Sequence, residues 1–316
     1  MVVKILKKTS IGKSHAKVIL MGEHSVVYGQ PAIALPLPDI SFTTTIKPRL
    51  AGQMIFTPTY QGPLSSLAEN YEGIRQLILR LLDFFNAKKQ PFTLHINSDI
   101  PQERGMGSSA ASAISIVRAF YDFFDTPLSN EHLQNWAAVE ERITHGSPSG
   151  LDTATVASNS PIWFIKNELT QPFELNLNAT FIMADTGIHG QTGLAVSVVR
   201  SLLEEQPHAT KKSIQHLGEL TTAAHHTLQS NTLSELGVLM NQAQAELQTL
   251  GVSHPQLDTL IHAARQAGAL GAKLTGGGIG GTMLALAPDQ KAADRIIEAL
   301  ENAGATEVWT QTYPTN

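Results

Sequence analysis

A glycine- and serine-rich turn at residues 101–111, PQERGMGSSAA, constrains the fold of this chain more than any other feature. The alternating segment 92–96 before it has the pattern of a β-strand, and the periodicity after it predicts a helix over residues 108–124. Glycines let the backbone approach an anion closely, and the first turn of a helix offers unpaired N–H groups. The turn is therefore a candidate phosphate-binding loop, with a plain glycine turn and helix cap as the alternative if it is considered alone.

Two other nucleotide-binding patterns fit the chain poorly. Gly105, Gly107 and Ala110 have the dinucleotide-binding spacing, but that site requires a second parallel strand ending in an acidic residue about 20 residues further on. Here the helix is followed by another predicted helix over residues 130–145. A Walker A loop is excluded, because its first glycine would fall on Lys7.

A second glycine cluster, KLTGGGIGGT at residues 273–282, lies between two predicted strands. Five of the six positions from 276 to 281 are glycine, and so flexible a loop loses much conformational entropy when it folds. Such a loop is explained if its backbone packs close to a ligand or to the first glycine loop. A flexible hairpin turn is the simpler alternative.

Ionisable residues gather at the start of the chain. Lys17, Glu23 and His24 flank the apolar segment 18–20. Charged groups beside an apolar strand indicate the edge of a pocket, although a solvated strand end has the same pattern.

A second group of ionisable residues lies near the middle of the chain. The helix over residues 130–145 leads into the turn HGSPSGLD, which presents Asp152, and an aspartate in such a turn is most often a cap. Glu140 and Glu141 are adjacent on this helix, and periodicity does not decide which of the two carboxylates is functional.

The order of the predicted elements indicates an α+β protein with two domains. In the first half we expect strands at 18–20, 32–35 and 42–46, a helix at 69–85, and Ser129 as the N-cap of the helix at 130–145. The second half is predicted to contain a strand at 181–184, three or four helices between 193 and 267 with breaks near Pro207, Asn231 and Pro255, strands at 272–274 and 282–286, a helix at 289–302 and a strand at 307–313. The polar stretch 165–180 is the predicted boundary, which gives domains of residues 1–170 and 171–316.

Composition excludes several classes of protein. A net charge of −5 lacks the basic excess of a nucleic-acid-binding surface, and no segment has 18 uninterrupted apolar residues that would span a membrane. The chain has no cysteine, which excludes a disulfide scaffold, a cysteine zinc site and a thiol nucleophile. The N-terminus lacks the pattern of a signal peptide, and we expect a cytoplasmic protein.

Taken together, three segments resemble the motifs of the GHMP kinases, a family named after galactokinase, homoserine kinase, mevalonate kinase and phosphomevalonate kinase. Motif 1 is KVILMGEHSVVYGQPAIALPL at 17–37, motif 2 is PQERGMGSSA at 101–110, and motif 3 is KLTGGGIGGTMLAL at 273–286. Their order and separations match the family, and Met106 stands where motif 2 usually has leucine. Within the family, motif 1 and the segment HGSPSGLDTA at 145–154 resemble the mevalonate kinase branch, in the compact form found in bacteria.

The resemblance implies a two-domain GHMP kinase fold, with a ribosomal-protein-S5-like N-terminal domain and a ferredoxin-like α/β C-terminal domain. It also implies ATP as co-substrate and Mg²⁺ as cofactor, with ATP between the domains. The residues that it assigns to ATP are Pro101, Gly105, Met106, Gly107, Ser108, Ser109 and Ala110.

The same resemblance assigns the catalytic and metal-binding residues by position. Asp152 matches the catalytic aspartate, which accepts the proton of a primary hydroxyl or orients that hydroxyl, and Lys17 matches the lysine near it. Lys17 would keep Asp152 ionised through its positive charge. Ser109 and Glu141 match the Mg²⁺ ligands.

Glu23, His24, Gly277 and Gly278, together with Lys17 and Asp152, are the expected substrate-binding residues. Motif 1 offers one permanent cation, Lys17, and a partial one, His24. This supply of charge suits an acceptor with a single carboxylate, such as mevalonate, better than one that also carries a phosphate.

Two alternatives remain open. A sister kinase, such as a phosphomevalonate kinase, would share the ATP site. An inactive family member that acts as a binding protein would lack Asp152, Lys17 or the glycine loop, and all three are present. The resemblance leaves the oligomeric state open, including a homodimer.

Overall fold

The computed structural model describes residues 9–100, 104–145 and 150–313. The chain divides into two compact units. The N unit consists of residues 1–16, 37–102 and 107–159, and the C unit of residues 17–36, 103–106 and 160–316. Two long strands, β1 (Ser10–Met21) and β2 (Ala32–Pro48), contribute residues to both units.

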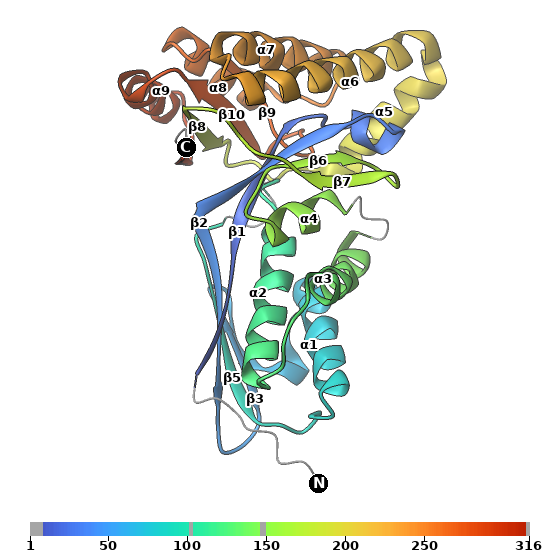
Figure 1. The fold of residues 1–316 in the computed structure, drawn as a ribbon, viewed down its shortest axis with the longest axis vertical. Coiled ribbons are helices and arrows are strands. Elements are labelled where there is room, and N and C mark those ends of the chain that lie inside the picture. The colour runs from blue at the N-terminus through green and yellow to red at the C-terminus, as the bar shows by residue number, and fades with distance from the viewer. Residues whose placement is uncertain (1–8, 101–103, 146–149, 314–316) are drawn as a thin grey trace. The chain divides into compact units, whose positions relative to one another are not determined.

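The N unit packs helices against one face of a small mixed sheet (Figure 1). Residues Phe42–Pro48 of β2 pair antiparallel with β5 (Phe92–Ser98), which pairs parallel with β3 (Gln53–Thr57), and β3 forms a hairpin with β4 (Tyr60–Pro63). The remaining elements of this unit are the 3-10 turns η2 (Leu64–Ser66) and η3 (Glu69–Tyr71) and the helices α1 (Glu72–Phe84), α2 (Ser108–Phe123), α3 (Asn130–His145) and α4 (Leu151–Ala157). Twelve of the sixteen residues of α2 are buried, so this helix forms the centre of the core.

The C unit contains a four-stranded antiparallel sheet in the order β11-β8-β10-β9. Its strands are β8 (Ala179–Asp185), β9 (Gly271–Leu274), β10 (Thr282–Ala287) and β11 (Glu307–Tyr313). Its helices are η1 (Ser25–Tyr28), α5 (Thr192–Glu205), α6 (Pro207–Ser230), α7 (Leu233–Thr249), α8 (Pro255–Gln266) and α9 (Gln290–Asn302). All residues of β8 and β10 are buried, so these two central strands are covered by protein on both faces. The strand order confirms the ferredoxin-like prediction.

The start of β2 belongs to the C unit, where residues Ala32–Ala34 pair with β6 (Ile162–Ile165). The β6 strand forms a hairpin with β7 (Leu169–Pro172), all of whose residues are exposed. This hairpin overlaps the start of the stretch, residues 165–180, in which the sequence predicts the domain boundary. The division into residues 1–170 and 171–316 stays a prediction.

Most predicted helices are confirmed, including the breaks at Pro207, Asn231 and Pro255. Ser129 caps α3 by accepting a hydrogen bond from the backbone N–H of His132 at 3.2 Å. The predicted strands at 32–35 and 42–46 are a single strand, β2. Two of its three prolines, Pro36 and Pro38, lie between the segment that pairs with β6 and the segment that pairs with β5, where they do not interrupt either ladder.

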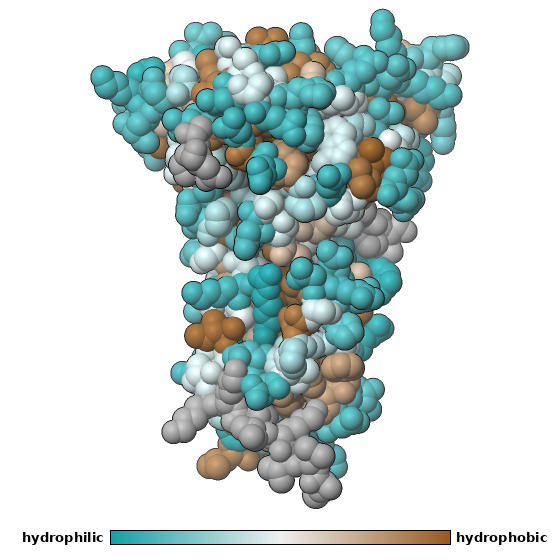
Figure 2. Space-filling model, viewed as in Figure 1, coloured by the Kyte–Doolittle hydropathy of each residue, from teal (hydrophilic) through white to brown (hydrophobic). Residues whose placement is uncertain are grey.

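Figure 2 shows that hydrophilic residues dominate the visible surface of both units, with hydrophobic ones in small separate groups. Within the ranges that the structure describes, every helix is too short or too polar to cross a membrane.

Candidate functional site

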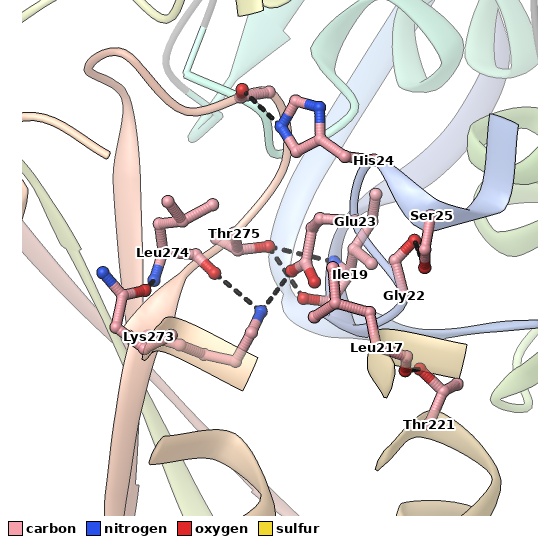
Figure 3. Close-up of polar contacts among 12 residues, drawn as sticks. Ile19, Gly22, Glu23, His24, Ser25, Leu217, Thr221, Lys273, Leu274 and Thr275 are labelled. Atoms are coloured by element: carbon pink, nitrogen blue, oxygen red, sulfur yellow. Dashed lines mark hydrogen bonds and ion pairs between the residues drawn. The ribbon is translucent and has the colours of Figure 1, made fainter. Parts of the chain in front are cut away.

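Motif 1 is anchored in the C unit by a buried ion pair. Glu23 lies in the turn after β1, and Lys273 lies on β9. The Lys273 Nζ donates hydrogen bonds to Glu23 Oε1 and, at 2.7 Å, to the carbonyl oxygen of Leu274 (Figure 3). Both charged side chains are fully buried. This contact joins motif 1 to the first residue of motif 3.

Burial shifts the pKa of each member of this pair toward its neutral form. It raises the pKa of the Glu23 carboxyl and lowers the pKa of the Lys273 ammonium, while the charge of each partner opposes the shift of the other. Burial of one charge is tolerated only because the other is beside it. Lys273 therefore holds Oε1 of Glu23, whereas Oε2 is buried without a hydrogen-bond partner among the described residues. The predicted contact of Glu23 with a substrate stays a prediction.

His24 is buried next to this pair in a left-handed backbone conformation, with φ of 59°. Its Nε2 is 2.9 Å from the carbonyl oxygen of Gly277 (Figure 3). A carbonyl oxygen only accepts, so Nε2 carries the hydrogen. Burial, aided by the charge of Lys273, lowers the pKa of His24 to about 4. The expectation that His24 is a partial cation is therefore wrong, because desolvation keeps the ring neutral near pH 7.

We expect this buried histidine to make the protein acid-sensitive. Because the pKa of His24 is about 4 in the folded chain and 6.5 in the unfolded chain, the unfolded chain binds the extra proton between these values. The free energy of unfolding should therefore fall as the pH drops from 6.5 to 4, by about 3 kcal/mol from this group.

Urea unfolding at several pH values, compared with a His24→Asn variant, measures this contribution. Asparagine, like histidine, is among the non-glycine residues found most often at positive φ, the sign of φ at His24. His262→Asn is the matched control, because His262 is exposed on α8. If wild type and His24→Asn lose stability in parallel, the neutral buried state of His24 is wrong.

The glycine loop of motif 3 packs against its own unit. A Cβ atom at Gly277 would lie 2.3 Å from Thr192 Oγ1, and one at Gly278 would lie 2.1 Å from the carbonyl oxygen of Val252. These contacts leave no room for a side chain, so packing alone explains both glycines. Their predicted contact with a substrate stays a prediction.

Motif 3 also holds the strand of motif 1. Thr275 Oγ1 accepts a hydrogen bond from the backbone N–H of Ile19 at 3.0 Å and donates one to the Ile19 carbonyl at 2.9 Å (Figure 3). These two hydrogen bonds to the backbone fix the register of β1 beside the glycine loop.

Residues 105 and 106 of motif 2 also contact motifs 1 and 3 within the C unit. The backbone N–H of Lys17 donates to the Met106 carbonyl at 3.0 Å, and the Met106 side chain is fully buried. Gly105 has a φ of 81°. A Cβ atom added to Gly276 would lie 3.1 Å from the Cα atom of Gly105. The expectation that one glycine loop packs against the other is confirmed. The three motifs, far apart in the sequence, meet within one unit.

The N unit supplies the rest of motif 2. Helix α2 begins at Ser108, and the preceding Gly107 has a φ of 76° and no side chain to cap the first turn. Ser109 Oγ donates a hydrogen bond to Glu140 Oε2 at 2.6 Å. The predicted partner of Ser109, Glu141, instead accepts a hydrogen bond from Thr153 Oγ1 at 2.7 Å. Pro101 lies outside the described residues.

The oxygen donors near Ser109 fit magnesium. At nucleotide sites Mg²⁺ commonly uses one or two carboxylates together with phosphate oxygens. The Ser109 hydroxyl and the Glu140 carboxylate bonded to it are donors of this kind, whereas the carboxylate of Glu141, the next residue of α3, is bonded to Thr153. In the described ranges, no group of three or more His, Cys, Asp or Glu side chains forms a metal cluster.

Asp152 and Lys17, the predicted catalytic pair, lie in different units. Asp152 is the second residue of α4, directly after Gly150, whose φ of 83° allows the chain to turn sharply into the helix. Its side chain is partly exposed, whereas that of Lys17 on β1 is buried. The exposure leaves the Asp152 carboxylate accessible to a small molecule.

Sequence reasoning missed three of these residues: Lys273, Glu140 as the partner of Ser109, and Arg104, which pairs with Asp185. A usable signal existed for Lys273, because a lysine inside the otherwise apolar strand GAKL requires a buried partner. Arg104 and Glu140 carry no local signal that identifies their partners.

The chain is similar to known proteins along its whole length. The family model "GHMP kinases N terminal domain" matches residues 74–160, and "GHMP kinases C terminal" matches residues 224–306. A mevalonate kinase from Pyrococcus furiosus is 33% identical over 323 residues, covering 95% of each chain.

Solved structures show the same likeness. The structure of L. major mevalonate kinase in complex with R-mevalonate has a TM-score of 0.86 and 26% identity, covering 100% of this chain and 99% of that one. The mevalonate kinase of methicillin-resistant Staphylococcus aureus MRSA252 has a TM-score of 0.77 and 32% identity, covering 98% of this chain and 100% of that one. Similar proteins thus occur in archaea, bacteria and a eukaryote.

Proposed function

This chain belongs to the GHMP kinase family, and from that premise we propose that it is a mevalonate kinase. The reaction transfers the γ-phosphoryl group of ATP to the primary hydroxyl of mevalonate and forms 5-phosphomevalonate, a step of isoprenoid precursor synthesis. The observation that carries the proposal is the 33% identity to a mevalonate kinase over 95% of both chains. All three family motifs lie within that similarity. A cytoplasmic location is part of the proposal, because the cytoplasm supplies ATP.

We assign the ATP phosphates to motif 2. In the first turn of α2 the N–H groups of Ser108, Ser109 and Ala110 have no partner within the helix, which suits an anion. Gly105 and Met106 precede it, with their backbone held by the contacts to motifs 1 and 3. Phosphoryl transfer depends mainly on positioning and charge stabilisation, so a backbone fixed in advance is an advantage.

Asp152 is the residue that we assign to the acceptor hydroxyl. Its carboxylate accepts the proton of the primary hydroxyl or orients that hydroxyl for attack. Lys17 carries the permanent positive charge of motif 1 and faces the acceptor side in this proposal. His24 is neutral and adds no positive charge. The positive charge of motif 1 is therefore suited to an acceptor with a single carboxylate.

We place Mg²⁺ on Ser109 and Glu141, with Glu140 hydrogen-bonded to Ser109. When bound, Mg²⁺ neutralises charge on the β- and γ-phosphoryl oxygens of ATP. The serine hydroxyl and a carboxylate of α3 are the groups that would hold it. This assignment agrees with the oxygen chemistry of these side chains.

A coupled ADP-release assay tests the function. We expect turnover with mevalonate, little or none with phosphomevalonate, galactose or homoserine, and loss of turnover when Mg²⁺ is removed with a chelator. Preferential use of phosphomevalonate would replace the proposal with its sister activity. ADP release with none of the four acceptors would favour a binding protein that has lost catalysis.

A further inference from the structure

Motif 2 carries a second charged anchor that the proposed function does not use. Arg104, directly before Gly105, has its Nε 3.1 Å from Asp185 Oδ2. The two side chains are 14% and 6% exposed, so this is an almost fully buried ion pair within the C unit. The pair lies outside the residues assigned to ATP, Mg²⁺ and mevalonate.

Asp185 is a rigid partner. It is the last residue of the central strand β8, with Thr282 and Glu307 as its neighbours on β10 and β11. Its Oδ1 accepts a hydrogen bond from the Gly187 backbone N–H at 3.0 Å, and its carbonyl accepts one from the Thr306 N–H at 2.9 Å. A guanidinium bonded to this carboxylate is therefore tied to the middle of the sheet.

Residues 104, 105 and 106 each contact another part of the C unit. The side chain of Arg104 is bonded to Asp185, and a Cβ atom at Gly281 would lie 3.3 Å from the Arg104 carbonyl oxygen. The Gly105 backbone contacts motif 3, and the Met106 carbonyl accepts from Lys17. Of these contacts, only the Arg104–Asp185 pair is made by side chains and can be removed without altering the glycines.

The charge of the pair indicates what it does. Arg104 and Asp185 neutralise each other, so the pair adds little to the field that attracts an anion. Arg104 Nη1 is buried and has no hydrogen-bond partner among the described residues, so it is not exposed to a ligand. The contribution of Arg104 is therefore geometric, through the backbone of residues 104–106.

We propose that Arg104 is a positioning residue for ATP: its ion pair with Asp185 fixes the backbone of Gly105 and Met106, and thereby the path into the phosphate-binding turn. This inference rests on the proposed function, in which motif 2 holds the phosphates. It separates Arg104 from the catalytic residues, since Arg104 acts only through the loop.

The test compares Arg104→Met, Asp185→Asn and the double variant. Since a misplacement of about 1 Å can reduce activity about 10²-fold, we expect each single variant to raise the KM for ATP about tenfold. The KM for mevalonate should change little. Because both changes break the same contact, the double variant should be no worse than the poorer single variant. Asp185→Asn retains an acceptor for the Gly187 N–H, which limits other damage.

Three further measurements keep the inference falsifiable. Calorimetry gives the Kd for ATP without any acceptor, so it remains informative even if mevalonate is not the substrate. Arg104→Lys keeps the charge but loses the planar fork of donors, and should restore ATP affinity only in part. Arg75→Met is the matched control, because Arg75 forms a partly exposed ion pair with Glu72 on α1.

The outcomes are distinguishable. A weaker Kd for ATP in both single variants, with Arg75→Met unchanged, supports the inference. A lower melting temperature with unchanged ATP affinity, or equal changes in both KM values, would overturn it. A wild-type protein that binds ATP but does not phosphorylate mevalonate would overturn the proposed function and leave the inference standing.

Discussion

Asp152→Asn should lower kcat by about 10²–10⁴-fold, the range that a positioned general base contributes, while the KM for ATP changes little. Asparagine keeps the shape of the side chain but cannot accept the proton of the acceptor hydroxyl. Asp152 is partly exposed at the start of α4, so the change should leave the fold intact. Steady-state kinetics with ATP and mevalonate varied in turn measure both quantities.

Asp294→Asn is the matched control for this variant, because Asp294 is exposed on α9. It should have wild-type kinetics. If Asp152→Asn retained more than about a tenth of the wild-type kcat, the loss would be smaller than the 10²–10⁴-fold that a general base contributes. The assignment of Asp152 as the base would then be wrong.

The second large effect concerns stability. Lys273→Met should lower the free energy of unfolding by about 3–5 kcal/mol, because it leaves the buried Glu23 carboxylate without its hydrogen-bonded cation and with only the weaker attraction of Lys17. That is a large fraction of a total stability of about 5–15 kcal/mol. Denaturant unfolding followed by circular dichroism measures the loss.

A double variant, Lys273→Met with Glu23→Leu, distinguishes the broken pair from general damage. Replacing both charges with apolar groups removes the unpaired carboxylate, so the double variant should be more stable than Lys273→Met alone. Lys88→Met is the control, because the Lys88–Asp83 pair is 71% and 64% exposed and such pairs contribute about 0–1 kcal/mol. A double variant less stable than both single variants would contradict a dominant role for the ion pair.

The elements that sequence could predict are those with long periodic patterns and clear ends. The helices α2 and α6 have both, and Pro207 and Asn231 mark the ends of α6. The strands β3, β4, β6 and β7 were missed because each has only four or five residues, too few for an alternating pattern to develop. The seven-residue helix α4 was missed for the same reason, since it follows a glycine turn and is too short to show a period.

For the candidate site, too, some residues could be proposed from the sequence and others could not. Motif residues such as Gly105, Ser109 and Asp152 could be proposed from the sequence because each stands in a segment that resembles the family. Their partners could not, because a hydrogen bond between Lys273 and Glu23 joins residues 250 positions apart. Only folding brings such side chains together, so burial and its effects, including the neutral ring of His24, were beyond the reach of sequence.

The discontinuous make-up of the C unit has a consequence for biosynthesis. Residues 17–36 leave the ribosome early, but β9 and the glycine loop after it, to which they are hydrogen-bonded, are translated more than two hundred residues later. Contacts of such long sequence separation slow folding, because a large loop must close before they form. β1 and the Glu23 carboxylate therefore lack their native partners through most of translation. A nascent chain with such unpaired groups is prone to aggregate, and we expect it to bind chaperones.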